Sequence, residues 1–490
     1  MLITNAVKYI RKRLYRTVKR TFSKKQLRRS LLKCFGWRHR LRRFPFAQLD
    51  SIQIIGNKGV LVQGVLIDPK HQVERVELLL HDNKHSPVEM DLSRFRDERL
   101  QTQAIPLHHS EKPGFLSLAS LPENSGLSME KYAMPFGIRL TLVSGRKINR
   151  RCRKPTIPPK ENLEGVRQIL ATVPHKTREK RTLFDDVYGP AVEHVWSHRK
   201  QTTSEGDLLE YNNHLKPANP AVTVVIPVYG RHDFIEYQLS SFSTDPDMKN
   251  HELLFIIDDP RLTSVVKENA EWLKKIYSIS FNILYLEQNL GYAGANNAGV
   301  RKATAQNILL LNSDVLPIRD GWLTELITAT GDNIKNALVG ARLLYEDNSV
   351  QHDGMEFFAS PFVDDLWTNI HPGKGLPVDL FDQNKTLIDR QLITGACLLI
   401  TKSNYELIGG LDERYILGDF EDSDLCMRAR QHGLEIKILQ NVELYHLERQ
   451  SQSLVSSDRW KQELTYYNCW QHTQQWDSAI RRLNTDRHDA

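Results

Sequence analysis

The sequence of 490 residues contains few cysteines and no long apolar run. Its five cysteines are scattered without a Cys-x-x-Cys pair, which argues against a disulfide framework or a thiolate zinc site and suits a reducing cytosol. No apolar run approaches the roughly 20 residues that a membrane-spanning helix needs. A secretory signal peptide is not expected either, because charged residues interrupt the N-terminus before an apolar stretch develops.

Acidic residues are missing before Asp50, whereas residues 1–44 contain 16 of the 66 Lys and Arg residues. Elsewhere 50 basic residues stand against 59 acidic ones, so the net charge of +7 belongs to this tail. Apolar residues recur in the tail at steps of three and four, namely Ile3, Val7, Ile10, Leu14, Val18 and Phe22. This spacing predicts a basic amphipathic helix that lies on an anionic membrane surface. Docking on the acidic remainder of the chain or on a partner is the alternative, and nucleic acid is disfavoured.

The length of the chain predicts two or three domains. Residues 45–152 contain short β-rich stretches separated by turn residues, which predicts a small β-sandwich-like accessory domain. Residues 153–220 are punctuated by prolines and weakly helical, for example over Glu161–Val173, and are interpreted as a connector. The main domain is predicted over 221–455, and a C-terminal helix with a core-facing side over 456–490.

In the main domain, apolar runs of strand length alternate with helical segments. Four such runs are Val222–Ile226, Leu253–Ile257, Phe281–Leu286 and Asn307–Leu311. This alternation predicts an α/β fold with a mostly parallel, Rossmann-like sheet. Ligands of such sheets lie beyond the carboxyl ends of the strands, so ligand-binding residues are expected directly after each run.

The first two runs end in residues suited to a nucleoside. Pro227 and Gly230 form a rigid turn that flanks Tyr229, whose ring can face a flat base. Asp258 follows the second run, where its carboxylate can accept a hydrogen bond from a base or a ribose hydroxyl.

The third and fourth runs end in residues suited to phosphates and a cation. Small residues over 289–299 let the backbone approach a ligand closely and open a helix whose N-terminus favours anions. The fourth run ends in Leu311-Asn312-Ser313-Asp314, which places a hard oxygen ligand after a buried strand.

With these motifs the sequence resembles the family-2 glycosyltransferases, which have the GT-A fold, over roughly Thr223–Ser453. Seven motifs carry the resemblance, in order Val225–Tyr229, Asn289–Gly291 with Asn296–Gly299, Leu310–Asp314, Thr394–Ala396, Gly409–Glu413, Glu421–Leu425 and His446. In detail the chain is similar to bacterial polysaccharide-building members.

The resemblance implies a nucleotide-sugar donor and a divalent cation. The donor-binding residues that it implies are Pro227, Tyr229, Asp258, Asn289, Gly291, Asn296, Asn312 and Ser313. Asp314 and His446 would ligate the cation, with Mn²⁺ favoured over Mg²⁺ because imidazole is a softer ligand than Mg²⁺ usually takes. The sequence departs from the family's Asp-x-Asp motif, since Asn312 stands in place of its first carboxylate.

The catalytic segment is predicted at the start of a helix over Glu421–His432, which Gly433 ends. Acidic residues in its first turn suit the helix dipole, and Asp424 is expected to pair with Arg428 one turn later. By the family pattern Asp422 is the general base, with Glu421 beside it.

The resemblance implies that the turn Thr394-Gly395-Ala396 lies beside the donor sugar and the acceptor. Residues 359–391 are interpreted as a mobile loop that influences substrate choice, in which Trp367 is either a packing residue or a sugar platform.

The resemblance implies a metal-dependent, inverting glycosyltransferase of bacterial surface polysaccharide synthesis. Its acceptor would be a glycan or a lipid-linked molecule, and its location cytoplasmic, peripheral at the inner face of the cell membrane. A non-catalytic protein that binds glycan or nucleotide within an assembly complex is the alternative. A nucleotide-sugar pyrophosphorylase is disfavoured because Tyr229-Gly230-Arg231-His232 lacks a Gly-rich, basic triphosphate loop.

Overall fold

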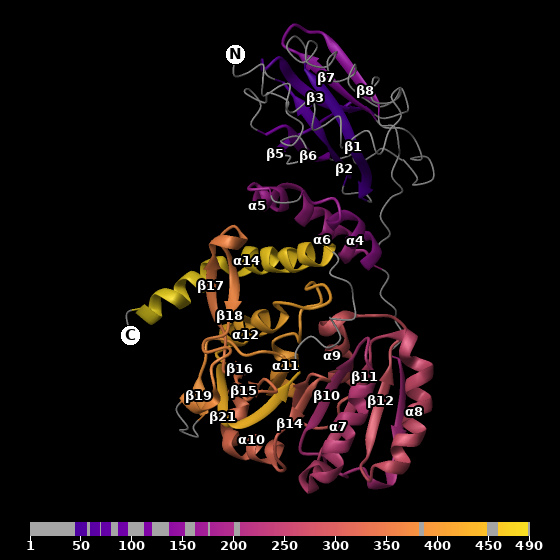
Figure 1. Ribbon diagram of the computed structural model, residues 1–490, viewed down its shortest axis with the longest axis vertical. Helices are drawn as coiled ribbons and strands as arrows, with labels where there is room; N and C mark the ends of the chain where they lie inside the picture. Colours follow the sequence, from indigo (N-terminus) through magenta and orange to yellow (C-terminus); the bar gives the residue numbers. More distant parts are fainter. Residues whose placement is uncertain are drawn as a thin grey trace, which may run out of the picture. The chain divides into compact units, whose positions relative to one another are not determined.

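The computed structural model divides the chain into two compact units, with the boundary between Val195 and Trp196 (Figure 1). It describes residues 45–55, 59–68, 70–79, 87–96, 112–119, 137–151, 162–174, 177–199, 206–381, 387–447 and 459–488. The basic helix predicted over 1–44 lies outside these residues.

The first unit contains two antiparallel sheets of four strands. One sheet has the order β1-β2-β6-β5, with β1 (Phe46–Ile55), β2 (Gly59–Ile67), β6 (Gly114–Ala119) and β5 (Ser93–Phe95). The other has the order β4-β3-β7-β8, with β4 (Val88–Glu89), β3 (Val73–Leu79), β7 (Gly137–Leu142) and β8 (Lys147–Arg151). Ile52 and Val62 of the first sheet and Leu78 and Leu140 of the second belong to one buried cluster, so the two sheets share a core.

Part of the predicted connector is helical and packs on the first sheet of this unit. It forms α4 (Leu163–Leu170), α5 (Lys180–Leu183), the π-helix η2 (Phe184–Tyr188) and α6 (Gly189–Ser197). The side chain of Asn162 caps α4 by accepting hydrogen bonds from two backbone N–H groups. Gln63 of β2 donates to the Thr172 carbonyl, and Ser93 of β5 donates to Asp186.

The second unit is an α/β domain whose long sheet has four parallel strands at its centre, as predicted. The strand order is β14-β21-β15-β20-β13-β10-β11-β12-β9. The parallel strands are β13 (Asn307–Leu311), β10 (Thr223–Val228), β11 (Glu252–Ile257) and β12 (Phe281–Tyr285).

Antiparallel pairs extend the sheet on both sides, and β15 and β21 add one more parallel pair. These flanking strands are β9 (Asp207–Tyr211), β14 (Val315–Pro317), β15 (Ala337–Leu344), β20 (Cys397–Thr401) and β21 (Glu435–His446). Two short strands, β16 (Val350–His352) and β19 (Leu387–Asp389), pair with β15 and β21.

Helices cover both faces of this sheet, which explains why its central strands are continuously apolar. One face packs against α7 (Asp233–Thr244), α8 (Thr263–Ile276) and α10 (Trp322–Thr330). The other packs against α9 (Gly291–Lys302), α11 (Lys402–Leu407), α12 (Glu421–Gln431) and α14 (Arg459–His488). Short 3₁₀ helices complete the unit, namely η3 (Asn213–Leu215), η4 (Pro246–Asn250), η5 (Pro260–Leu262), η6 (Gly331–Lys335), η7 (Pro361–Val363) and η8 (Val378–Leu380).

The mobile-loop interpretation of residues 359–391 is wrong for its first part. β17 (Glu356–Ser360) and β18 (Leu366–Ile370) form an antiparallel hairpin that lies beside α14 (Figure 1). Trp367 is 7% exposed, and its indole N–H donates to Asp477 of α14 over 2.8 Å. Trp367 is therefore a packing residue rather than a sugar platform.

No helix within the described residues has both the length and the apolar character to span a membrane.

Candidate functional site

The nucleoside residues follow β10 and β11, which are parallel neighbours. Pro227 lies within β10, opposite Ile256 of β11, and Tyr229 follows the strand with its side chain partly exposed. Asp258 is 3% exposed, and its Oδ1 accepts the backbone N–H of Leu290 over 2.6 Å. Burial raises the pKa of Asp258 well above its usual range, although the N–H groups of Leu290 and Gly291 oppose this rise. Asp258 therefore joins the end of β11 to the start of α9.

Arg261 lies near this edge and was not predicted. Its guanidinium carbon is 5.8 Å from the centre of the Tyr229 ring, and the group makes a two-pronged contact with the carboxylate of Asp259. Asp259 is 2% exposed, so its charge is compensated by a partner whose side chain is 74% exposed. Tyr229 and Arg261 thus present a flat aromatic surface and a positive charge together.

The small-residue stretch forms the first turns of α9. The Asn289 side chain accepts the N–H of Gly291, whose φ of +74° favours glycine. A Cβ at Gly291 would lie 3.2 Å from Cα of Leu417, so glycine also permits a close backbone approach. Asn296 is fully buried in the helix, and its Nδ2 donates to the Tyr292 carbonyl. The structure places Asn289 and Gly291 at the strand edge and Asn296 in the interior.

The two predicted cation ligands lie together. Oδ1 of Asp314 is 3.3 Å from Nε2 of His446, and the two side chains are 12% and 13% exposed. β14, which directly follows Asp314, pairs with the end of β21, where Val315 lies opposite His446. Ser313 lies between Asn312 and Asp314 in the same turn and is partly exposed.

Gln351 of β16 fixes the orientation of the His446 ring. Its Nε2 donates to the main-chain carbonyl of His446 over 3.1 Å, so its Oε1 is the atom that lies 2.6 Å from Nδ1 of the ring. An oxygen at that distance requires Nδ1 to carry a proton, so in the neutral ring the lone pair of Nε2 is directed toward Asp314. A metal-ligating histidine uses this tautomer.

The residues present fit a divalent cation. They offer an imidazole nitrogen and a carboxylate oxygen, and the buried Oδ1 of Asn312 has no hydrogen-bond partner among the described residues. Nδ2 of Asn312 is 3.5 Å from Nε2 of His446, so this amide belongs to the same cluster. Within the described part of the chain no group of three or more His, Cys, Asp or Glu could hold a metal. The protein supplies two strong ligands, and a diphosphate would supply others.

The turn Thr394-Gly395-Ala396 connects the cation pair to the acidic helix start. The Ala396 carbonyl accepts the N–H of Asn312 over 3.0 Å. On the other side, the N–H of Gly395 donates to Oδ2 of Asp422 over 3.3 Å. Thr394 anchors the turn, because its N–H donates to His352 and its Oγ1 accepts the N–H of Ala396.

Tyr292 also contacts this turn, a role that the sequence did not predict. Its hydroxyl donates to the Gly395 carbonyl over 2.8 Å, and a Cβ at Gly395 would lie 2.8 Å from that hydroxyl oxygen. A side chain at position 395 would therefore displace the Tyr292 hydroxyl from this turn.

Asp422 and Glu421 begin α12 as predicted, and Gly433 follows the helix with a φ of +77°. The Asp422 carboxylate is partly exposed and accepts hydrogen bonds from Gly395 and from the N–H and hydroxyl of Ser423. Burial raises the pKa of Asp422, while these backbone N–H groups oppose the rise. Burial, followed by the charge of Asp422, raises the pKa of Glu421 well above its usual range. Oε2 of Glu421 has no hydrogen-bond partner among the described residues.

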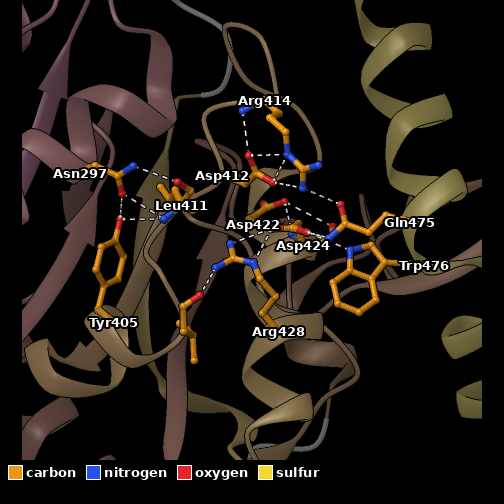
Figure 2. A network of polar contacts seen from close by, with 12 residues as sticks. Asn297, Tyr405, Leu411, Asp412, Arg414, Asp422, Asp424, Arg428, Gln475 and Trp476 are labelled. Atoms are coloured by element: carbon orange, nitrogen blue, oxygen red, sulfur yellow. Dashed lines mark hydrogen bonds and ion pairs between the residues drawn. The ribbon is translucent and has the colours of Figure 1, made fainter. Parts of the chain in front are cut away.

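Asp424, two residues further on, has a structural role. It is fully buried, and Arg428 reaches its Oδ2 at 2.7 Å, which is the pairing predicted one turn along the helix. Its Oδ1 accepts the indole N–H of Trp476 at 2.9 Å and the amide of Gln475 at 3.1 Å, both from α14 (Figure 2). The contacts with Gln475 and Trp476 tie α12 to α14, and Arg428 occupies the other oxygen, so Asp424 is not available for chemistry.

Known proteins are similar to parts of this chain. Residues 223–387 match the model of the family described as glycosyl transferase family 2. The O-antigen biosynthesis protein RfbC of Myxococcus xanthus is 22% identical over 253 residues, which cover 50% of this chain and 19% of that protein. The dTDP-rhamnosyl transferase RfbF of Shigella flexneri is 20% identical over 203 residues, 41% of this chain and 62% of that protein. This chain therefore spans about a fifth of the first relative's length and under two thirds of the second's.

Among solved structures, the mannosyltransferase PcManGT from Pyrobaculum calidifontis in complex with GDP-Man and Mn²⁺ matches with a TM-score of 0.35 and 12% identity, over 64% of this chain and 84% of that one. The family match lies within the α/β unit, from β10 to the first residue of β19, so it includes Asp314 and ends before Asp422 and His446. The chain thus contains a domain of glycosyl transferase family 2.

Proposed function

We propose that the second unit transfers a sugar from a nucleotide-diphosphate donor to a hydroxyl of a glycan or lipid-linked acceptor, with inversion at the anomeric carbon. One observation carries the proposal. A continuous set of contacts runs from His446 and Asp314 through Asn312 and the turn 394–396 to Asp422. A pair of cation ligands and a carboxylate with a raised pKa therefore face the same short turn.

The donor side of this arrangement suits a nucleoside diphosphate. Tyr229 offers its ring to a base, and the carboxylate of Asp258 can accept a hydrogen bond from the base or the ribose. The N-terminus of α9, which begins at Gly291, favours negative charge on the phosphates.

Asp314 and His446 would hold a divalent cation, with Mn²⁺ favoured over Mg²⁺ for the imidazole ligand. When bound, such an ion stabilises negative charge on the departing diphosphate. Arg231 adds positive charge within electrostatic range of Asp314.

The chemical step assigned to the chain is a proton transfer to Asp422. The acceptor oxygen forms a bond to the anomeric carbon while its proton passes to the Asp422 carboxylate. The bond from the anomeric carbon to the phosphate oxygen breaks, and its electron pair leaves with the nucleoside diphosphate. Positioned base catalysis of this kind contributes about 10²- to 10⁴-fold. Attack on the face opposite the leaving group inverts the configuration.

The test compares Asp422→Asn with Asp424→Asn, two isosteric changes on the same helix. Asp422→Asn is expected to lose turnover while it retains donor affinity and thermal stability. Asp424→Asn should lower stability and retain turnover per folded molecule, because its contacts are structural. Near-normal turnover by Asp422→Asn would remove the base from the proposal. Donor binding with no transfer by the unaltered protein to any of a panel of glycan acceptors would favour the non-catalytic alternative.

The setting of this activity is also a proposal. The O-antigen and rhamnosyl transferase relatives support a role in bacterial surface polysaccharide synthesis. Residues 1–44 support attachment of a cytoplasmic enzyme to the inner face of the membrane, because they carry 16 positive charges and no negative one. Deletion of 1–44 should abolish co-sedimentation with vesicles that contain anionic phospholipid and retain turnover on a soluble acceptor. Co-sedimentation of the deletion variant would contradict the attachment.

A further inference from the structure

The segment that leads into Glu421 and Asp422 has an unusual backbone. Leu417, Gly418, Asp419 and Phe420 all have positive φ, with values of 65°, 149°, 76° and 76°. Three of these four residues carry a Cβ, and such residues rarely adopt this region. Strained conformations of this kind persist only where the surrounding structure holds them. Contacts with the surrounding structure must therefore hold Ile416–Phe420.

A single side chain of α14 makes three hydrogen bonds to this segment. Nδ2 of Asn468 donates to the Ile416 carbonyl at 3.1 Å and to the Gly418 carbonyl at 2.6 Å. Its Oδ1 accepts the N–H of Ile416 at 3.2 Å. Asn468 is fully buried, so water does not compete for these bonds. On the same helix, the Thr465 hydroxyl donates to the Asp419 carboxylate at 2.8 Å.

The other side of the segment rests on the helix that begins the donor edge. The Leu417 carbonyl accepts the N–H of Tyr292 at 3.2 Å, beside the close approach of Gly291. The Phe420 carbonyl accepts the N–H of Asp424, so the segment continues directly into the first turn of α12. The left-handed conformation of residues 417–420 thus sets where α12 begins and where Glu421 and Asp422 lie.

We propose that Asn468 is a positioning residue for sugar transfer, which holds Ile416–Phe420 so that Asp422 meets the turn at Gly395. The inference rests on the proposed base role of Asp422. An asparagine with a purely local structural role would bond its own helix. All three hydrogen bonds of Asn468 instead reach one segment about 50 residues away, just before the base.

The test uses Asn468→Leu, which keeps the buried volume and removes all three hydrogen bonds, and Asn468→Ala. Both should lower kcat by about 10- to 100-fold, because a displacement of about 1 Å in a reacting group costs roughly this much. Donor affinity should change by less than about threefold, since only transition-state positioning is lost. Amide hydrogen exchange of residues 417–420 should accelerate.

The matched control is Asn484→Ala, on the same helix. Asn484 accepts a hydrogen bond from the Gln391 side chain and contacts no residue of 416–422 in the hydrogen bonds described. It should keep the wild-type kcat and the wild-type exchange of residues 417–420. If Asn468→Leu retained full kcat while Asn468→Ala lost it, packing alone would explain the effect and the inference would be wrong.

A further comparison separates this inference from the proposed function. Active Asp422→Asn would overturn the base role, whatever Asn468 does. Inactive Asp422→Asn together with unaltered kcat in Asn468→Leu would overturn the positioning role alone. Should both Asn468 variants fail to fold, Thr465→Val provides the test, because Thr465 is exposed. It should lower kcat and speed exchange at 418–420, and wild-type values for both would refute the proposal.

Discussion

Gln351 and His446 form a reciprocal pair in which one amide side chain contacts both the ring and the main chain of the histidine. The amide nitrogen donates to the His446 carbonyl, and the amide oxygen lies 2.6 Å from Nδ1. Because the carbonyl can only accept, the amide has one orientation and the imidazole one tautomer. The contact thus prepares Nε2 of His446 as a ligand beside Asp314.

Gln351→Leu should therefore weaken cation binding by about 10- to 100-fold, the usual cost of losing a partner that orients a ligand. Turnover at saturating Mn²⁺ should stay close to wild type. A Mn²⁺ titration of transfer and calorimetric Mn²⁺ binding would measure the effect. Gln440→Leu is the matched control, because Gln440 donates to Asp353 instead of contacting His446. An unchanged Mn²⁺ requirement in Gln351→Leu would contradict the orienting role.

Removal of divalent cations should abolish transfer. EDTA treatment followed by added Mn²⁺ is expected to restore turnover more fully than added Mg²⁺, because one of the two protein ligands is imidazole. Asp314→Ala should not recover with either ion. The thermal midpoint of the wild type with a panel of nucleoside diphosphates should rise further when Mn²⁺ is present, as ligand binding to the folded state raises stability. Full activity in excess chelator would refute the cation assignment.

The pH dependence of transfer should reflect the titration of Glu421 and Asp422 at the start of α12. Asp422 accepts a proton only when it is ionised, and burial raises its pKa above the usual 3.8. The value of kcat/KM should therefore fall as the pH falls, with an apparent pKa above that of an ordinary aspartate, and the two neighbouring carboxyls titrate in coupled steps. The pKa of Glu421 is raised further than that of Asp422, so Glu421 is protonated while Asp422 titrates, and Glu421→Gln should leave the acid limb close to its wild-type position. A large displacement of the acid limb in Glu421→Gln would show that Glu421 is charged while Asp422 titrates.

Asp424→Asn should destabilise the second unit by about 3–5 kcal/mol, because it leaves the partly buried guanidinium of Arg428 without its fully buried counter-charge. Denaturant unfolding would measure the loss. The control is Asp412→Asn, also in the network of Figure 2, where Asp412 pairs with Arg414, whose side chain is 55% exposed. A solvent-exposed pair contributes about 0–1 kcal/mol, so the control should cost far less. Equal losses in the two variants would contradict the distinction.

The sequence predicted the features that depend on local pattern. Apolar runs placed the parallel strands, and the spacing of Asp424 and Arg428 predicted an ion pair within one helix. The end of α12 followed from Gly433, whose φ of +77° suits glycine. Each of these features is decided by residues within one turn or one strand of each other, so a single sequence contains the necessary information.

The features that the sequence did not predict depend on contacts between distant residues. Gln351 lies in a strand of three residues, and nothing near it in the chain indicates that it faces His446, 95 residues away. The left-handed backbone at Leu417 and Phe420 could not be expected, because neither residue favours it. The residues that contact this segment, such as Asn468 of α14 and Tyr292 of α9, lie far from it in the sequence. The β17–β18 hairpin was missed because its exposed residues, such as Phe358, obscure the alternation of a strand.

Two buried histidines should make the second unit less stable in mild acid. His251 and His472 are 3% and 0% exposed, and neither ring has a hydrogen-bond partner among the described residues. Burial lowers the pKa of His251 to about 4 and that of His472 to about 3. The unfolded chain therefore binds these protons more readily, with a pKa of about 6.5, so the stability present above that pH is lost as the pH falls toward the folded values.

Between pH 7 and pH 5, each histidine should cost about 2 kcal/mol of unfolding free energy, since one pKa unit corresponds to about 1.4 kcal/mol. The rings of Phe357, Tyr415 and Phe420 surround His472, so His472→Leu removes a titrating group from an apolar site. Denaturant unfolding at the two pH values should show a smaller pH dependence in His472→Leu than in the wild type. His232→Leu is the control, because His232 is less buried and its side chain contacts Asn269. A wild-type pH dependence in His472→Leu would show that the ring is protonated in the folded protein, because a neutral buried imidazole would contribute to the slope and its removal would reduce it.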